Sequence, residues 1–194
     1  MLLLLALKLA GAQVSVEQYH YVGAGQPLMW CPIVHYRSPT DWYAEMRYNY
    51  EDNRTLSLYT GRTFAHEGGR LSYSATPLVG GVVGRFKGGS VGLNLTLDFN
   101  NLFFESQSQY SFGVDGESPD FLFAWSEVGY QMRPWLFGGV SAQNTYLCQD
   151  ESQLLDPGIF LGVELGAWSF PVYAFAPRSG DPFFVVGINF KPRE

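Results

Sequence analysis

Charged side chains are scarce in this sequence. Only 15% of its 194 residues are Asp, Glu, Lys or Arg, against about 25% in an average soluble domain. Basic residues number 12 and acidic residues 18, a balance that disfavours a nucleic-acid-binding protein. Hydrophobic residues reach an ordinary 46%, and the mean hydropathy is -0.04. A normal apolar content with so little charge indicates a surface that partly faces something other than water.

Long hydrophobic runs are also missing beyond the N-terminal segment. That segment, MLLLLALKLAGA, is a short apolar run ending in Ala10-Gly11-Ala12, a pattern typical of signal-peptide cleavage. We therefore predict a signal peptide over residues 1–12. No later stretch approaches the roughly 18 apolar residues of a membrane-spanning helix. The aromatic content of 16% excludes an intrinsically disordered chain.

Alternation with a period of two dominates the remainder of the chain. In residues 42–51, 91–99, 159–167 and 184–191, every second residue is apolar or aromatic, and most residues between them are polar or glycine. Successive side chains of a strand point to opposite faces, whereas a helix repeats every 3.6 residues. No segment shows a helical repeat, so the sequence predicts an all-β protein.

Turn residues between these runs divide the chain into twelve expected strands. Their ranges are 29–37, 42–51, 54–64, 70–76, 79–86, 90–99, 102–113, 120–132, 135–147, 157–167, 168–176 and 182–191. If 70–86 formed one bent strand, the count would fall to ten. Short and long connections alternate, which is the habit of outer-membrane barrels with short periplasmic turns. This division leaves 13–28 as an N-terminal tail, 29–191 as the barrel and 192–194 as a C-terminal tail.

Strand length and side-chain placement favour a closed antiparallel up-and-down transmembrane β-barrel over a secreted β-sandwich. The strands match the 9–11 residues, roughly, that a tilted strand needs to cross the hydrocarbon. Aromatic residues flank the apolar face near strand ends, as in the girdles of such barrels: Trp42, Tyr50, Phe64, Phe99, Tyr110, Phe112, Tyr130, Tyr146, Trp168 and Phe190. A sandwich with an ordinary aromatic core is the alternative.

The chain resembles small outer-membrane β-barrel proteins of Gram-negative bacteria over residues 28 to 191. The resemblance rests on the repeated alternating strands, the short turns and the closing FFVVGINF, which looks like the aromatic-rich last strand of this class. The sequence departs from the pattern by continuing past Phe190 to Glu194. The resemblance implies an outer-membrane location and a porin-like architecture, and it assigns no activity.

The polar face of the expected strands carries the most suggestive candidate site. Four carboxylates and one arginine project inward from different strands: Glu45, Arg47, Glu105, Glu127 and Glu164. Arg37 and Lys191 are candidate partners. Paired carboxylates could serve a glycosidase, but that requires a groove and a defined separation. We favour a structural charge network inside a narrow barrel, with aromatic residues filling much of the remaining space.

Two expected outer loops are rich in acidic residues. They contain Asp115, Glu117, Asp120, Asp150, Glu151 and Asp156. Neither loop has the Asp-x-Asp-x-Asp-Gly spacing of a calcium loop. We therefore predict a solvated acidic rim, with no metal and no cofactor.

Histidine and cysteine offer little catalytic chemistry. The histidines are His20, His35 and His66. His35 or His66 could serve an outer-membrane lipid hydrolase, with His35 expected toward the outer end of its strand. Cys31 and Cys148 are expected at opposite ends of the barrel, beyond the reach of a disulfide.

The leading interpretation is a non-enzymatic integral outer-membrane barrel, either structural or a narrow pore for small solutes. A lipid hydrolase or deacylase that uses a lumen or rim histidine is one alternative, and an accessory subunit of an envelope complex is another. The expected partners are outer-membrane lipid, small solutes or such a complex, with no nucleic acid. The sequence leaves the oligomeric state open.

Overall fold

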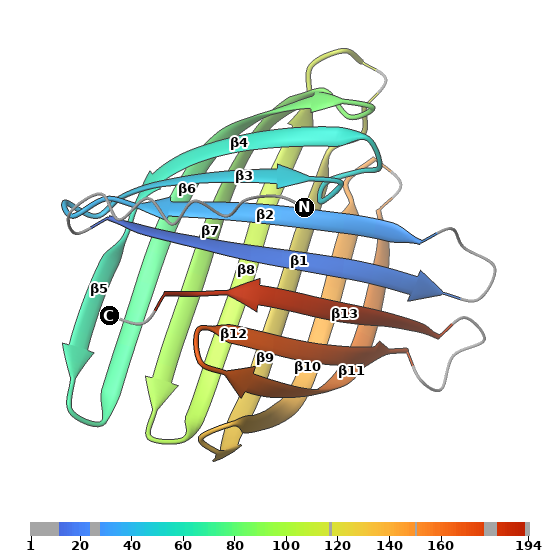
Figure 1. Cartoon of the computed structure of the whole chain (residues 1–194). Coiled ribbons are helices and arrows are strands. Elements are labelled where there is room, and N and C mark those ends of the chain that lie inside the picture. The colour runs from blue at the N-terminus through green and yellow to red at the C-terminus, as the bar shows by residue number, and fades with distance from the viewer. Residues whose placement is uncertain (1–11, 24–27, 117, 150, 177–181, 193–194) are drawn as a thin grey trace, which may run out of the picture.

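The computed structural model describes residues 12–23, 28–116, 118–149, 151–176 and 182–192. These residues form strands and connections (Figure 1), and none of them lies in a helix long and apolar enough to span a membrane. The strands are β1 (Gln13–Gly23), β2 (Met29–Arg37), β3 (Trp42–Tyr48), β4 (Thr55–Arg62), β5 (Phe64–Gly68), β6 (Leu71–Gly84), β7 (Gly88–Phe99), β8 (Leu102–Gly113), β9 (Phe121–Arg133), β10 (Leu136–Leu147), β11 (Ser152–Leu165), β12 (Trp168–Phe175) and β13 (Phe183–Phe190).

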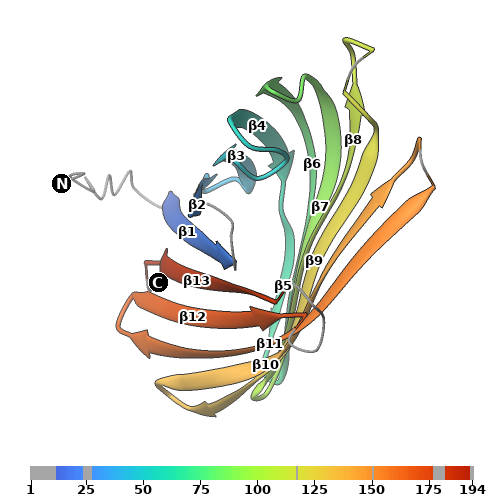
Figure 2. The same cartoon turned by 90° about the vertical axis from the view of Figure 1, so that its right-hand side faces the viewer.

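The strands close into a barrel. Apart from β4 and β5, strands that are neighbours in sequence pair antiparallel, and β1 also pairs with β13. Both β4 and β5 pair with β6, so they are two halves of one wall strand and the wall contains twelve strands. Figure 2 shows the strands wrapping around a common interior. The closed antiparallel barrel predicted from the sequence is confirmed.

β6 is continuous through Pro77, where the sequence suggested a turn between two strands. Pro77 pairs with Leu93 of β7 on one side. On the other side it lies between Leu78, which pairs with Gly61 of β4, and Ala75, which pairs with Phe64 of β5. The missing N–H of proline thus falls at the break between β4 and β5, where no ladder hydrogen bond is lost. The prediction of separate strands 70–76 and 79–86 was wrong.

β1 lies in the segment that the sequence suggested was an N-terminal tail. Residues 13–23 are a full strand between β2 and β13, with Glu17 and Tyr19 on the inner face. The strand count of twelve survives because this added strand offsets the fusion within β6. The predicted signal peptide falls almost wholly on residues outside the described part of the chain.

The two ends of the barrel differ in their connections. The turn end carries the connections 38–41, 69–70, 100–101, 134–135 and 166–167, together with the beginning of β1 and the end of β13. The loop end carries the connections 49–54 and 85–87, together with the described residues next to the strand ends at 28, 114–116, 118–120, 148–149, 151, 176 and 182. Residues before β6 were predicted at the opposite ends of the barrel, because β1 was not counted as a strand. The predicted division of β6 into two strands restored the correct ends for the residues that follow it. His35 therefore lies toward the turn end and Cys31 toward the loop end.

The outer surface of the barrel is a belt of exposed apolar side chains. Leu58, Val140, Ile159 and Leu161 each leave more than half of their surface accessible. Trp42, Tyr130 and Trp168 lie near the turn end of this belt. The alternation in the sequence thus sorts apolar side chains outward and polar or aromatic ones inward, as in barrels that face lipid.

Candidate functional site: the barrel lumen

A mainly aromatic hydrophobic cluster, called the aromatic cluster below, occupies the lumen along β9 to β13 and the adjoining β1 and β2. Its buried members are Tyr19, Cys31, Ile33, Trp125, Phe137, Phe160, Tyr173, Phe175 and Val185. The ring centroids of Trp125 and Tyr19 lie 4.9 Å apart, and those of Trp125 and Tyr173 lie 5.2 Å apart. Trp125 also donates its indole N–H to Ser141 at 2.8 Å. These contacts make the cluster a packed core inside the barrel.

Arg47 is the centre of a buried charge network on the opposite wall. Its guanidinium pairs with Glu45, lies 3.7 Å from Glu51 and donates to Gln109 of β8. The side chains of both glutamates have no accessible surface, and that of Arg47 has 2%. The guanidinium also lies over the rings of Tyr50 and Tyr59, at 4.4 and 4.6 Å from their centroids. Such pairing is what allows an arginine to be buried.

The connection 49–54 at the loop end sends side chains into the lumen. Asn49 and Arg54 have positive φ angles of 58°, and these two residues turn the chain inward. The Tyr50 hydroxyl donates to Gln107 of β8 at 2.9 Å, and its ring packs edge-on against Phe123 of β9. Glu51 accepts bonds from Ser57 and Tyr59 of β4 and from Gln109 of β8.

Tyr50 joins the two walls of the barrel. It contacts Arg47 on one side and packs against the aromatic cluster on the other. We call Arg47, Glu45, Glu51, Tyr50, Gln107 and Gln109 the cross-lumen network. Together with the aromatic cluster it links side chains of opposite walls across the lumen. The expectation that Tyr50 belongs to the outer aromatic girdle was wrong, because β3 ends at Tyr48 and the following turn reverses its direction.

His35 makes charged and hydrogen-bonded contacts in the lumen. Its Nδ1 is 3.1 Å from Glu45 Oε2, and its Nε2 is 3.3 Å from Glu17 Oε1. Tyr43 bonds both to His35 and to Glu45. Among the described residues, the contacts of His35 include no serine, and His66 stacks on Tyr73 at 5.3 Å. The described part of the chain therefore does not pair His35 or His66 with a serine of the kind a lipid hydrolase uses as its nucleophile.

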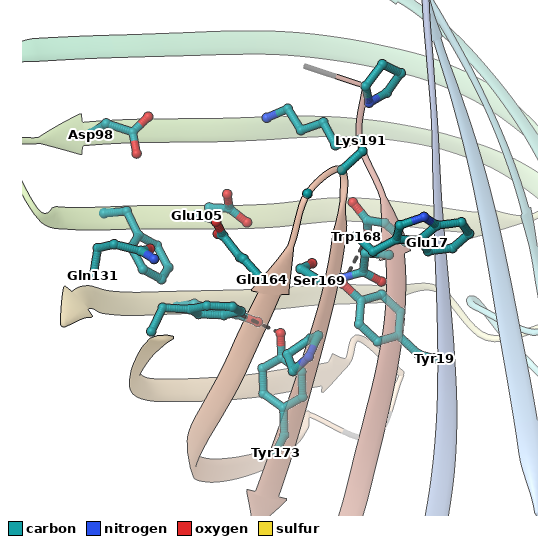
Figure 3. Close-up of a pocket in the computed structure, with 18 of the residues that line it drawn as sticks. Glu17, Tyr19, Asp98, Glu105, Gln131, Glu164, Trp168, Ser169, Tyr173 and Lys191 are labelled. Atoms are coloured by element: carbon teal, nitrogen blue, oxygen red, sulfur yellow. Dashed lines mark hydrogen bonds between the residues drawn. The ribbon is translucent and has the colours of Figure 1, made fainter. Parts of the chain in front are cut away.

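A cavity of about 550 Å³ opens at the turn end of the lumen. Figure 3 shows Glu17, Glu105, Glu164 and Lys191 around it. Asp98 and Glu127 complete its charged lining, and Tyr19, Phe103, Phe137 and Tyr173 contribute aromatic surface. We call this cavity the vestibule. Its lining contains five carboxylates and one lysine.

Glu105 and Glu127 lie directly opposite each other on β8 and β9. The Tyr173 hydroxyl donates to Glu127 at 3.3 Å. The register of β8 and β9 therefore brings two carboxyl groups together on the wall of the vestibule.

The structure places only some of the acidic residues expected at the outer rim in loop-end connections. Asp115, Asp120 and Glu151 lie in loop-end connections, whereas Glu117 and Asp150 lie outside the described residues. Asp156 was wrongly placed in a loop. It is a residue of β11 and pairs with the buried Gln143 of β10, because this hairpin ladder continues to the pair Leu147 and Ser152.

Both described cysteines are free. Cys31 and Cys148 lie toward the same end of the barrel, so the predicted separation between opposite ends was wrong although no disulfide forms. Within the described ranges, no group of three His, Cys, Asp or Glu is arranged to hold a metal ion.

The sequence pattern did not reveal three lumen residues, Glu17, Glu51 and Tyr50. Glu17 was hidden because polar residues interrupt the apolar face of β1. Glu51 and Tyr50 lie just past a strand end, where alternation ceases to report direction. The charged pattern Glu45, Arg47, Glu51 was the available signal, since a buried arginine beside one glutamate calls for a further acceptor.

Comparison with known proteins gives a structural match only. No protein-family model and no curated protein sequence matches the chain. The KdgM porin superposes with a TM-score of 0.58 at 11% sequence identity, covering 91% of this chain and 98% of that one. The KdgM porin in complex with disordered oligogalacturonate gives 0.57. The fold is that of an outer-membrane β-barrel.

A second match is larger than this chain. OccAB4 of Acinetobacter baumannii superposes with a TM-score of 0.52 at 11% identity, covering 89% of this chain. The chain spans 56% of the length of OccAB4. At such identities the likeness establishes the architecture, and the lumen residues must carry any functional argument.

Proposed function

We propose that this protein is an integral barrel of the bacterial outer membrane that forms a narrow, cation-preferring passage for small solutes, closed in the state described here. The observation that carries the proposal is the arrangement of the lumen. An acidic vestibule leads from the turn end to a packed layer of side chains, and that layer contains a charge network rather than apolar residues alone.

The outer face supports the membrane location. Apolar side chains form a belt around the closed sheet, and a closed sheet leaves no unpaired strand edge in the hydrocarbon. In such barrels the short turns are periplasmic, so the turn end with its vestibule faces the periplasm and the loop end faces the outside.

The lining of the vestibule supports the preference for cations. Five carboxylates face one lysine across a space of about 550 Å³, and a lumen lined by one sign of charge concentrates counter-ions. Oligogalacturonate, the saccharide in the KdgM complex, is an anion, and this lining would repel it. The passage is therefore suited to inorganic cations and small organic amines.

The cross-lumen network supports the closed state. Tyr50 bridges from the connection 49–54 to Gln107 and Phe123 on the far wall. Its hydrogen bond to Gln107 is one that water can replace when the tyrosine moves away. Opening therefore requires movement of this short connection, while the wall strands stay in place.

Conductance recordings on the purified, folded barrel in planar bilayers test the proposal. We expect rare or small openings for the natural chain and larger or more frequent ones for Tyr50→Ala. Tyr146→Ala, which alters a tyrosine on the outer face, is the matched control and should leave conductance unchanged. In a KCl gradient the reversal potential should show cation preference, reduced in Glu105→Gln/Glu127→Gln. Silence of both the natural chain and Tyr50→Ala would refute the passage, and anion preference would refute the selectivity.

A further inference from the structure

The lipid-facing side of β1 carries two polar side chains. Tyr19 points inward and is buried, so by strand alternation Gln18 and His20 point outward. Their direct partners on β13, Ile188 and Val186, are exposed apolar residues of the outer belt. In Figure 1, β1 lies between β2 and β13 on the side facing the viewer.

The register sets the depth of this pair. Along β1, Val16 pairs with Phe190 near the turn end and Val22 pairs with Phe184 near the loop end. Gln18 and His20 lie between these two aromatic levels. They are therefore at the middle of the apolar belt, away from both headgroup regions, where water and lipid headgroups supply few hydrogen bonds.

Other polar side chains on the outer belt are satisfied within their own barrel. The hydroxyls of Ser106 and Ser126 bond to each other at 2.9 Å across β8 and β9. Ser108 donates to the Leu93 carbonyl and Thr60 donates to the Tyr43 carbonyl, both at 3.2 Å. Each of these hydroxyls thus has at least one hydrogen-bond partner within its own barrel.

Gln18 and His20 have more hydrogen-bonding groups than they can satisfy together. Gln18 Nε2 lies 2.8 Å from His20 Nε2. An amide nitrogen only donates, so the imidazole Nε2 accepts and the neutral ring carries its proton on Nδ1. The imidazole N–H of His20, the second amide N–H of Gln18 and the amide oxygen Oε1 of Gln18 are then left over. Leaving such groups in hydrocarbon is unfavourable.

We propose that a second copy of this chain covers this face, in a two-fold dimer through β1. A two-fold axis beside β1 places the pair of one copy against the pair of the other, so that each leftover imidazole N–H meets a leftover amide oxygen. The patch is self-complementary because it offers two N–H donors and an amide oxygen that can accept two hydrogen bonds, which is what an isologous interface requires. Lipid tails offer neither group. The inference rests on the membrane location proposed above and is independent of conduction.

The test compares mass and proximity in lipid nanodiscs. The natural chain should be a dimer, and Gln18→Leu/His20→Leu should raise its dissociation constant by about tenfold or more. Leucine suits a lipid-facing position, so this variant should fold as well as the natural chain, which heat-modified gel mobility verifies. Ser106→Leu/Ser126→Leu, on the wall formed by β8 and β9, is the matched control and should remain dimeric.

Cysteine cross-linking locates the interface. In a Cys148→Ser background, with the buried Cys31 retained, Gln18→Cys should form an intermolecular disulfide, whereas Ile159→Cys on β11 should not. A folded, inserted chain that stays monomeric would overturn the proposal, as would a dimer that survives Gln18→Leu/His20→Leu. Cross-linking through Ile159→Cys alone, or stoichiometric capture of a different protein on this face, would also overturn it. If the barrel does not insert into lipid, the proposed membrane location is refuted together with the interface.

Discussion

Replacing Arg47 with methionine should be the most destabilising single change in the lumen. Methionine keeps much of the apolar stem but removes the charge. The ion pair with Glu45, the 3.7 Å contact with Glu51 and the bond to Gln109 are all lost. Both carboxylates then remain fully buried without their cation.

The magnitude follows from burial. Breaking a buried ion pair by removing one partner costs about 3–5 kcal/mol, because an uncompensated charge stays behind. Each cation–π contact with Tyr50 and Tyr59 adds about 0.5–2 kcal/mol to that loss. Arg37→Met is the control, since Arg37 and Asp41 form a partly exposed pair with accessible fractions of 32% and 44%. Pairs of this kind contribute about 0–1 kcal/mol.

Reversible urea unfolding in micelles, followed by tryptophan fluorescence, measures both variants. The free energy of unfolding should fall by at least about 3 kcal/mol for Arg47→Met, since the lost cation–π contacts add to the loss of the ion pair. Glu45→Gln/Arg47→Met should be more stable than Arg47→Met alone, because it removes a buried charge that has lost its partner. A loss no larger than that of Arg37→Met, or no gain in stability from adding Glu45→Gln, would refute the account of the network.

Three further predictions concern other parts of the barrel. Glu105→Gln should stabilise the folded state by about 0.2–1 kcal/mol in the same unfolding assay, because it removes repulsion from the directly opposed Glu127. A loss of stability would contradict repulsion between these two glutamates. Gly139→Ala should be strongly destabilising, because the added Cβ would lie 2.0 Å from the Val128 carbonyl oxygen. Gly81→Ala should be tolerated, because its Cβ would have no atom within 4 Å. Equal unfolding midpoints for the two variants would contradict the close approach of β9 and β10. Hydrogen bonds from the Tyr110 hydroxyl and the Gly113 N–H hold the pKa of Asp120 below its usual value. These hydrogen bonds therefore stabilise the connection 114–120 above the ordinary carboxyl pKa, and the stabilisation is lost as the pH falls through the lowered pKa of Asp120. The protection factor of the Gly113 amide against hydrogen exchange should fall in acid. In Asp120→Asn the same protection factor should not depend on acid.

The sequence alone was sufficient for the architecture and for much of the lumen. Alternation with a period of two is a local property, because each strand residue points opposite to its neighbour whatever the partner strand is. That rule correctly directs Glu45, Arg47 and Trp125 inward and Ile159 outward. It also yields the hairpins from β7 onward, since their turn residues stand between clearly patterned runs.

Tertiary structure decided the features that depend on a partner. Pro77 continues a strand only because the break between β4 and β5 lies opposite it, and no local signal encodes that coincidence. Tyr50 enters the lumen because the chain turns at Asn49 and finds Arg47, Gln107 and Phe123 there. Local pattern carries the direction of a side chain within a strand, but not what the chain meets after the strand ends.

β1 shows both halves of this division. Glu17 and Tyr19 alternate correctly with Val16, yet Gln18 and His20 interrupt the apolar face and made the segment look like a tail. Pairing with β13 closes the barrel and makes the segment a strand regardless of that interruption. The sequence by itself determined which residues share a face. Only closure of the sheet decided that this face belongs to the wall, because closing the ring satisfies the backbone groups of two strand edges at once.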